Sequence, residues 1–374
     1  MTDKIKKRAV SAVLVCMIAA FLAVPAFAYS DVEEQASAAG VYEVEASLDA
    51  EATELMEGIS ASDTDTAGSF SKLMKAIKAL LPDVLSAALR SGASVMIIAA
   101  LCSVAQTVLD TAESRWSDGA SLAGIAAVSL CVFGTSKGFI GLGGETLDRL
   151  DSFSKVLLPT MTGLAAASGE AASSAAKYAA ASLFIDVLIT LAHDLILPLI
   201  YAYGAAVVAQ AAFGNKSLAA AVSLLKWLAG VMMTLLVLAF IVYLGLTGVV
   251  SGVTDAAALR LARTAISTAL PVVGSIMSDA AASVLSGTSL LRGTVGVFGI
   301  LGITAVCAVP FLRLGAHFLV YKSVSKLTAG FCGSRMESLI GGLAGVFGLV
   351  LGLAGSCAVM LYISLISLIK VVTY

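Results

Sequence analysis

Charged side chains are scarce in this sequence. Of its 374 residues, 13% are Asp, Glu, Lys or Arg, whereas 59% are hydrophobic. A water-soluble domain is about one-quarter charged, because its surface needs a polar shell. Too few charges are present to form such a shell, so lipid must cover much of the surface and the protein is a polytopic membrane protein. The formal net charge of −2 also excludes a basic nucleic-acid-binding protein, so no nucleic acid is expected as a partner.

Motifs for nucleotide, metal and thiol chemistry are lacking as well. The glycine cluster Gly141–Gly144 is without the lysine that a phosphate-binding P-loop requires, and neither His193 nor His317 lies in an H-E-x-x-H motif. We therefore expect no enzyme activity, no catalytic residue and no metal or other cofactor, so that any ATP-driven step comes from a partner. Outside the N-terminal apolar segment, the cysteines have no C-x-x-C spacing and are interpreted as packing residues: Cys102, Cys131, Cys307, Cys332 and Cys357.

The first 69 residues divide into two segments of different composition. Residues 1–28 have a basic start, an apolar core and the small-x-small sequence Ala26-Phe27-Ala28, which predict a cleaved signal peptide. An uncleaved first span is the alternative. Residues 29–69 hold 11 of the 25 acidic residues and no Lys or Arg. Such a tract buries too little apolar area to order itself, so we expect an acidic, disordered extracytoplasmic segment.

An interfacial amphipathic helix is predicted over residues 70–82. Apolar side chains recur there at helical spacing with lysines between them, and Pro82 is expected to end the helix. A helix of this kind lies in the plane of the bilayer surface. The polytopic membrane domain then occupies residues 83–374.

Several apolar runs are long enough to cross a membrane as helices, which takes about 20 residues. Runs of that length occupy 84–109, 120–142, 218–250, 293–320 and 338–369. The stretch 178–213 is longer and contains Pro198, so it is either one kinked span or a hairpin of two short ones. The predicted fold class is therefore all-α, with six or seven transmembrane helices.

Two further apolar segments, 145–168 and 255–290, begin with charged residues and continue through a Leu-Pro step into small residues. We expect each to be an amphipathic or re-entrant segment rather than a span. Their similar order of features is either an internal duplication, of the kind that builds transporters, or a coincidence of composition.

The orientation in the membrane depends on 178–213. Lys322, Lys326 and Arg335 form the best basic loop, which the positive-inside rule places in the cytoplasm. With the mature N-terminus outside, this placement requires 178–213 to cross once and leaves the C-terminus outside. A hairpin reverses both assignments, and the sequence leaves the two open.

Ionisable residues within the apolar segments are candidates for function, because burying an ion in hydrocarbon is costly. Asp186 and His193 share a helix face, with Asp194 beside them. They form either a proton or cation relay or a structural polar pair between helices, and the structural interpretation is favoured. Arg313 and His317 lie one turn apart near the end of their span, where we expect them to face lipid headgroups.

Glycines on the last apolar run indicate close helix packing. Small residues allow helix backbones to approach each other in a membrane. The helix they contact belongs either to this chain or to another subunit. The glycines concerned form two G-x-x-x-G motifs, Gly341 with Gly345 and Gly348 with Gly352.

An unusual charged pattern lies within the apolar region 245–300. It includes the sequences Gly248-Val249-Val250-Ser251-Gly252-Val253-Thr254-Asp255, Pro271-Val272-Val273-Gly274 and Leu290-Leu291-Arg292-Gly293. With the signal segment and the acidic N-terminus, this pattern resembles the stage III sporulation protein AE family. The positions that match, all of unknown role, are Asp255, Arg260, Arg263, Pro271, Gly274, Asp279 and Arg292.

The resemblance implies a role in endospore formation. The family is a polytopic component of a channel that links the mother cell to the engulfed forespore, in the mother-cell (outer forespore) membrane. Its implied partners are other stage III sporulation A-operon proteins, including an ATPase and ring-forming subunits, a forespore-side channel partner and membrane lipid. We expect a membrane subunit of that channel, acting as export gate or scaffold. A secondary permease for an ion or small metabolite is the alternative.

Overall fold

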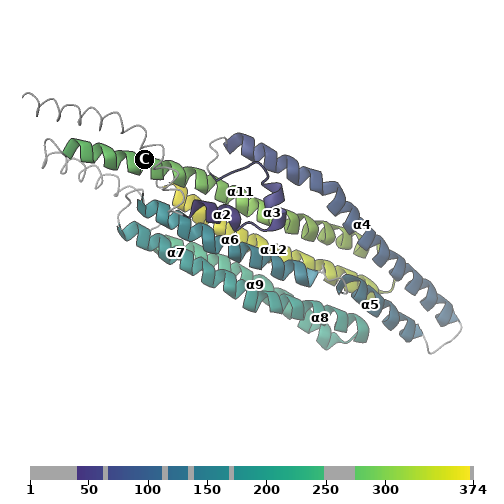
Figure 1. The fold of residues 1–374 in the computed structure, drawn as a ribbon. Coiled ribbons are helices and arrows are strands. Elements are labelled where there is room, and N and C mark those ends of the chain that lie inside the picture. The colour runs from purple at the N-terminus through teal and green to yellow at the C-terminus, as the bar shows by residue number, and fades with distance from the viewer. Residues whose placement is uncertain are drawn as a thin grey trace, which may run out of the picture.

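The structure, a computed structural model, describes residues 40–61, 66–111, 117–133, 139–167, 172–247 and 274–370, and every regular element in these ranges is a helix. Two short helices come first and long helices follow in one elongated bundle (Figure 1). In chain order the elements are α2 (Val41–Ala46), α3 (Ala50–Leu55), α4 (Thr66–Thr111), α5 (Ser117–Phe133), α6 (Phe139–Ala167), α7 (Ala172–Leu191), the π-helix η1 (Ala192–Ile196), α8 (Leu197–Phe213), α9 (Lys216–Thr247), α11 (Gly274–Thr328) and α12 (Ser334–Lys370).

The long helices run back and forth along the bundle (Figure 1). After α4, helices α5 and α6 return in tandem, α7 to α8 and then α9 make the next two passes, and α11 and α12 make the last two. The Ser91 hydroxyl lies 2.7 Å from the Tyr321 hydroxyl, and Ser103 donates a hydrogen bond to the Phe331 carbonyl, so α4 and α11 are parallel. Helices α11 and α12 lie at the centre, in contact with α4, α6 and α8.

Glycines on α12 allow this central helix to approach its neighbours closely. A Cβ on Gly345 would lie 2.8 Å from the Tyr203 hydroxyl of α8, and one on Gly348 would lie 3.0 Å from the Phe318 ring of α11. Gly341 likewise faces Ser325 of α11, whereas Gly352 has ordinary contact distance to Met233 of α9. The predicted G-x-x-x-G glycines therefore lie against helices of this same chain.

The turns after α8 and α11 lie at one end of the bundle. Gly214 ends α8 with φ 66°, a left-handed conformation that favours glycine, and a Cβ there would lie 3.2 Å from the Nε atom of Arg335. We call this end the basic end. Its basic residues are Lys216, Lys322, Lys326 and Arg335.

Five of the described helices are long and apolar enough to cross a membrane, rather than six or seven. They cover Ala67–Leu109, Ser182–Phe213, Lys216–Tyr243, Gly293–Thr328 and Ser334–Ile366. The difference arises at 120–142, where the apolar helix α5 ends at Phe133 and the more polar α6 begins at Phe139. The protein is thus an all-α polytopic membrane protein.

The stretch 178–213 is one continuous helix and not a hairpin. Helices α7 and α8 join through η1, whose wider turn inserts an extra residue without ending the helix. Pro198 lies in the first turn of α8, directly after η1. A proline has no backbone N–H to donate, and the first turn of a helix is where this loss is tolerated best. Of the two alternatives that the sequence leaves open for 178–213, the structure therefore has the single kinked helix.

The predicted disorder of 29–69 is wrong for the part described, residues 40–61. Val41 and Val44 of α2 and Ala52 and Leu55 of α3 are buried, because α2 packs on α6 and α3 packs on α11. The composition argument considers the tract alone, whereas the bundle supplies the apolar surface that the tract lacks. Residues 29–39 and the predicted signal peptide, 1–28, lie outside the described residues.

Pro82 does not end a separate interfacial helix, because α4 continues through it to Thr111. An interior proline removes one backbone hydrogen bond and bends a helix, and α4 is visibly curved in Figure 1. Leu73, from the predicted lipid-facing stripe, is fully buried in the protein. Leu73 therefore packs within the protein, whereas Phe70 of the same predicted helix is 52% exposed.

The segment 145–168 is not re-entrant either. Its residues belong to the unbroken helix α6, which passes through Pro159 and packs between α7, α11 and α12. A Cβ on Gly302 of α11 would lie 2.4 Å from the Phe153 ring, so this close packing holds α6 to α11 along its length. The second such segment, 255–290, is described only from Gly274, where α11 begins.

Candidate functional site

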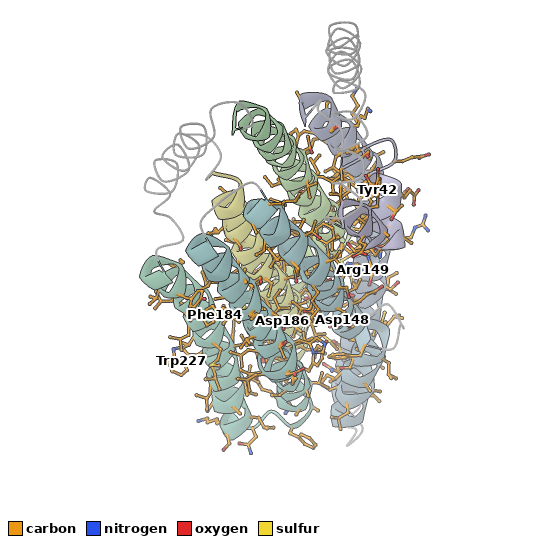
Figure 2. The ribbon with its side chains drawn as sticks, turned by 60° about the vertical axis from the view of Figure 1, so that its left-hand side comes forward. Tyr42, Asp148, Arg149, Phe184, Asp186 and Trp227 are labelled. Atoms are coloured by element: carbon orange, nitrogen blue, oxygen red, sulfur yellow. The ribbon has the colours of Figure 1, made fainter. Side chains whose placement is uncertain are left out.

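Helix α6 carries most of the charged side chains that lie between helices of the bundle. Five charged residues lie between positions 145 and 155 of this helix, and they reach two different neighbours (Figure 2). Arg149 is directed to α3 and α11, whereas Asp148 and Lys155 are directed to η1 and α7. The five residues are Glu145, Asp148, Arg149, Asp151 and Lys155.

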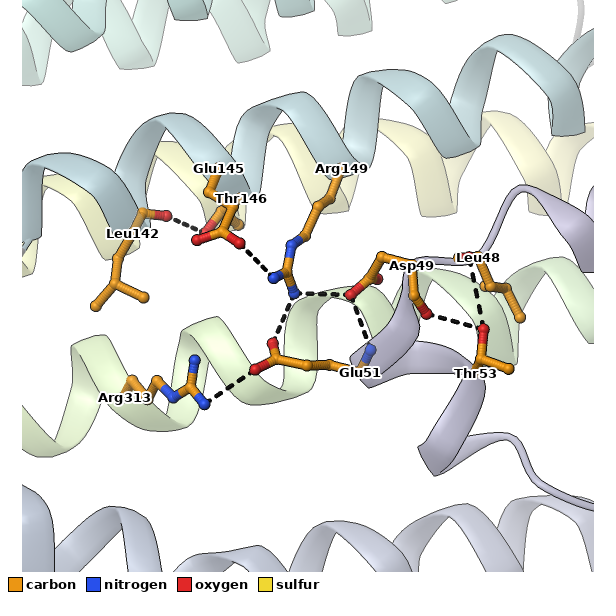
Figure 3. A network of polar contacts seen from close by, with 9 residues as sticks. All are labelled: Leu48, Asp49, Glu51, Thr53, Leu142, Glu145, Thr146, Arg149 and Arg313. Atoms are coloured by element: carbon orange, nitrogen blue, oxygen red, sulfur yellow. Dashed lines mark hydrogen bonds and ion pairs between the residues drawn. The ribbon is translucent and has the colours of Figure 1, made fainter. Parts of the chain in front are cut away.

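The first cluster joins three segments that are far apart in the sequence (Figure 3). Arg149 Nη1 lies 2.8 Å from Asp49 Oδ2 and 2.7 Å from Glu51 Oε2, and its Nη2 lies 2.5 Å from Glu145 Oε1. Arg313 of α11 donates to the other Glu51 oxygen at 3.0 Å. The Arg149 side chain is only 18% exposed. One carboxylate thus joins α3 to both α6 and α11.

The charges of this first cluster shift the pKa of its members. Burial disfavours the charged Glu51 carboxylate, but the hydrogen bond from Arg149 and the positive charges of Arg313 and Arg149 outweigh it, so the pKa of Glu51 is lowered. Burial likewise opposes the charge of Arg149, and its carboxylate partners raise its pKa nevertheless. Glu51 and Arg149 are therefore both ionised near neutral pH.

The second cluster joins α6 to η1 and α7. Lys155 Nζ lies 2.6 Å from Asp151 and 3.5 Å from Asp186, and His193 lies 3.4 Å from Asp148 and 2.9 Å from Asp194. Asp186 and His193, singled out on 178–213, thus meet polar partners on α6, and Asp194 meets His193 beside it. This arrangement favours the structural interpretation, a polar contact between helices. The π-helix directs His193 toward α6, and such π-bulges are frequent at functional sites.

Two open pockets lie in the described part of the bundle, one beside the first cluster and one toward the basic end. One of about 440 Å³ borders the first cluster and is lined by Asp49, Glu51, Glu145, Asp148 and Arg149 together with serines. Another of about 330 Å³ lies toward the basic end, where Cys102, Gln106, Cys332 and Arg335 line it. Both are bordered by polar groups that ion pairs or hydrogen bonds already hold.

Arg313 and His317 do not face lipid headgroups as predicted. Arg313 binds Glu51, and the His317 ring stacks on Tyr321 and on Phe347 at centroid distances of 6.1 and 5.3 Å. Both side chains therefore point into the bundle, because α11 is a central helix with neighbours on most of its faces.

The family-matching positions are hardly described by the structure. Asp255, Arg260, Arg263 and Pro271 lie outside the described residues. Gly274, Asp279 and Arg292 lie in the first part of α11, of which the backbone alone is described. All seven remain family-matching positions to which the sequence assigns no role.

Comparison with known proteins identifies the family. A family model described as stage III sporulation protein AE matches residues 51–372, which include every member of the two charged clusters except Asp49. The chain belongs to the stage III sporulation protein AE family. This finding confirms the resemblance seen at 245–300, and membership makes this a sporulation protein.

One relative in this family is the stage III sporulation protein AE of Bacillus subtilis (strain 168). It is 25% identical over 178 residues, which are 48% of this chain and 45% of that protein. The matched part thus spans less than half the length of that stage III sporulation protein AE. No solved structure matches the chain.

Sequence reasoning missed Arg149 and Glu51 as interacting residues. The signal was present as a lone arginine among carboxylates on α6 and a wholly acidic tract before α4. Their 98-residue separation hides the contact, which the fold alone brings about.

Proposed function

We propose that this chain is a membrane subunit of the channel between mother cell and forespore, acting as an export gate or scaffold rather than as an enzyme. Family membership over residues 51–372 carries the proposal. The fold supports it, since five apolar helices form one bundle and the charged side chains of α6 join helices to one another. Polar groups used in this way fix helix positions, which a scaffold requires.

The proposal includes a location and partners. The location is the mother-cell (outer forespore) membrane, and the partners are other stage III sporulation A-operon proteins, including an ATPase and ring-forming subunits, with a channel protein on the forespore side. The positive-inside rule orients the basic end toward the cytoplasm, from which an ATPase acts. The N-terminal segment then lies toward the opposite side, where extracytoplasmic ring-forming subunits assemble.

Gene deletion and complementation in the host test the channel role. Loss of the gene is expected to leave engulfed forespores that fail in late forespore gene expression, and the intact gene is expected to restore it. The protein should co-purify with ring-forming subunits from sporulating cells. Full late gene expression in the deletion strain would contradict the proposal.

The second candidate function is a secondary permease. The observation that favours it is the row of ionisable groups between α6 and α7, with His193 in a π-helix. Purified protein in liposomes would then move an ion or small solute, and Asp186→Asn would reduce that flux. Absence of flux by the protein alone, with co-purification of ring-forming subunits, would favour the channel subunit.

A further inference from the structure

The α2–α3 segment, residues 40–61, packs on the long helices of the bundle. Its helix α2 packs on α6, and α3 packs on α11 and the edge of α4. Figure 3 shows the ion pairs that join Asp49 and Glu51 to Arg149 of α6 and Arg313 of α11. The buried apolar side chains that hold it are Val41, Val44, Ala52, Leu55, Met56 and Ile59, none more than 8% exposed.

Hydrogen bonds within the segment close it on itself. Glu45 Oε1 accepts from the Ser60 hydroxyl at 2.7 Å and from the Ala61 backbone N–H at 2.5 Å. Lys72 at the start of α4 donates to the Gly58 carbonyl at 3.1 Å. The segment therefore keeps its own shape by local contacts, and Asp49 and Glu51 supply its ionic contacts with α6 and α11.

The surface beneath the segment has a defined chemistry. We call it the docking surface and define it by Arg149 and Thr160 of α6 and Arg313 of α11. The two guanidinium groups share Glu51, and Gly40 approaches Thr160 so that a Cβ on it would lie 3.5 Å from Oγ1. Two arginines beside an apolar surface are complementary to a helix with one acidic and one apolar face.

We propose that this docking surface binds acidic amphipathic helices, that α2–α3 occupies it as an intramolecular ligand, and that an acidic helix of a partner subunit displaces α2–α3. The partner helix carries a carboxylate at the position of Glu51 and apolar residues spaced like Ala52 and Leu55. This inference goes beyond the channel role and does not depend on it.

Hydrogen exchange on the full chain in lipid nanodiscs tests whether the segment is released. Glu51→Gln removes the shared carboxylate charge, and exchange over 40–61 should become about tenfold faster or more, with α11 and α12 unchanged. Glu54→Gln is the matched control, because Glu54 is exposed on the same helix. If 40–61 exchanges as slowly as α11 in both variants, or if all helices accelerate together in Glu51→Gln, the segment is part of the core and the proposal is wrong.

A labelled peptide of residues 40–61 then tests the docking surface itself. The Glu51→Gln chain should bind it about tenfold more tightly than the wild-type chain, whose surface is occupied. A peptide carrying Glu51→Gln should bind weakly to both. Should Glu51→Gln fail to fold, Asp49→Asn replaces it, since this change removes one carboxylate partner of Arg149 and keeps a side-chain oxygen for the N-cap of α3. Equal binding of both peptides, or no binding to a chain whose segment is released, overturns the proposal.

Discussion

A single carboxylate, Glu51, determines how the N-terminal segment responds to acid. Glu51 pairs directly with Arg149 and Arg313. Asp49 and Glu145 share the Arg149 guanidinium with it. Because the folded pKa of Glu51 lies below its ordinary value of 4.5, its ion pairs stabilise the fold fully above that pH. The stabilisation is lost as the pH falls through the lowered folded pKa.

We therefore expect the melting temperature of wild type to exceed that of Glu51→Gln by a constant amount between pH 5 and pH 8. The difference should shrink below about pH 4.5. Thermal unfolding of the two proteins in detergent across this range measures it. A difference that persists unchanged in strong acid would show that the charge of Glu51 contributes nothing.

Gly342 has the least room of the glycines on α12. A Cβ there would lie 2.4 Å from Val207 Cγ1 of α8, and the stiff, β-branched valine has little freedom to move aside. Gly342→Ala should destabilise the bundle by about 1–3 kcal/mol through overpacking. Gly355→Ala on the same helix is the control, because nothing lies within 4 Å of its Cβ position. Equal unfolding midpoints for the two variants would contradict this packing.

The sequence predicts close packing on α12 but neither its partner nor its tightest position. The G-x-x-x-G spacing selects Gly341, Gly345, Gly348 and Gly352, whereas Gly342 lies outside both motifs. Which neighbour each glycine meets depends on how α8 and α11 are placed around α12. That placement is set by contacts between residues more than a hundred positions apart, such as Tyr203 with Gly342.

At the scale of helices, the π-helix η1 sets the rotation of α7 relative to α8. Its extra residue keeps Asp186 beside Lys155 and the Phe184 ring stacked on Tyr243 at 4.1 Å. Deleting Leu195 restores an ordinary α-helix and turns α7 by about 100° relative to α8. We expect this deletion to lower the melting temperature more than Leu195→Ala, which removes the side chain without changing the register. Equal melting temperatures would show that the rotation of α7 is not fixed by η1.

Proline and charge mislead sequence reasoning about these helices for one physical reason. Pro82, Pro159 and Pro198 each suggest a break, and the charges of α6 suggest a position outside the bundle. In the structure, neighbouring helices hold the backbone across each proline, and oppositely charged side chains meet between helices. Local pattern rules describe a helix in isolation, so they place apolar runs correctly and miss these tertiary compensations.

At the scale of the whole molecule, the single pass of 178–213 predicts which loops share a side. Cysteines introduced at Asn215 and Gly330, in the turns of the basic end, should be labelled by an impermeant maleimide only after the membrane is opened. A cysteine at the exposed Glu57 should be labelled in intact cells. Ser325, in the predicted basic loop, is buried and unsuitable as a probe. Labelling of Asn215 and Gly330 from opposite sides would contradict the fold.

The length of α11 has a mechanical consequence. Its 55 residues make a helix of roughly 80 Å, against a hydrocarbon thickness of about 30 Å. The part near Gly274 extends past the neighbouring described helices (Figure 1), while α11 is packed in the bundle from Val295 to the basic end. One part of α11 is thus held by neighbouring helices, and the other part extends beyond them as a continuation of the same helix. A force on the extended part of α11 would reach the packed part and the turn after Thr328, because α11 is a single helix with no loop between these places.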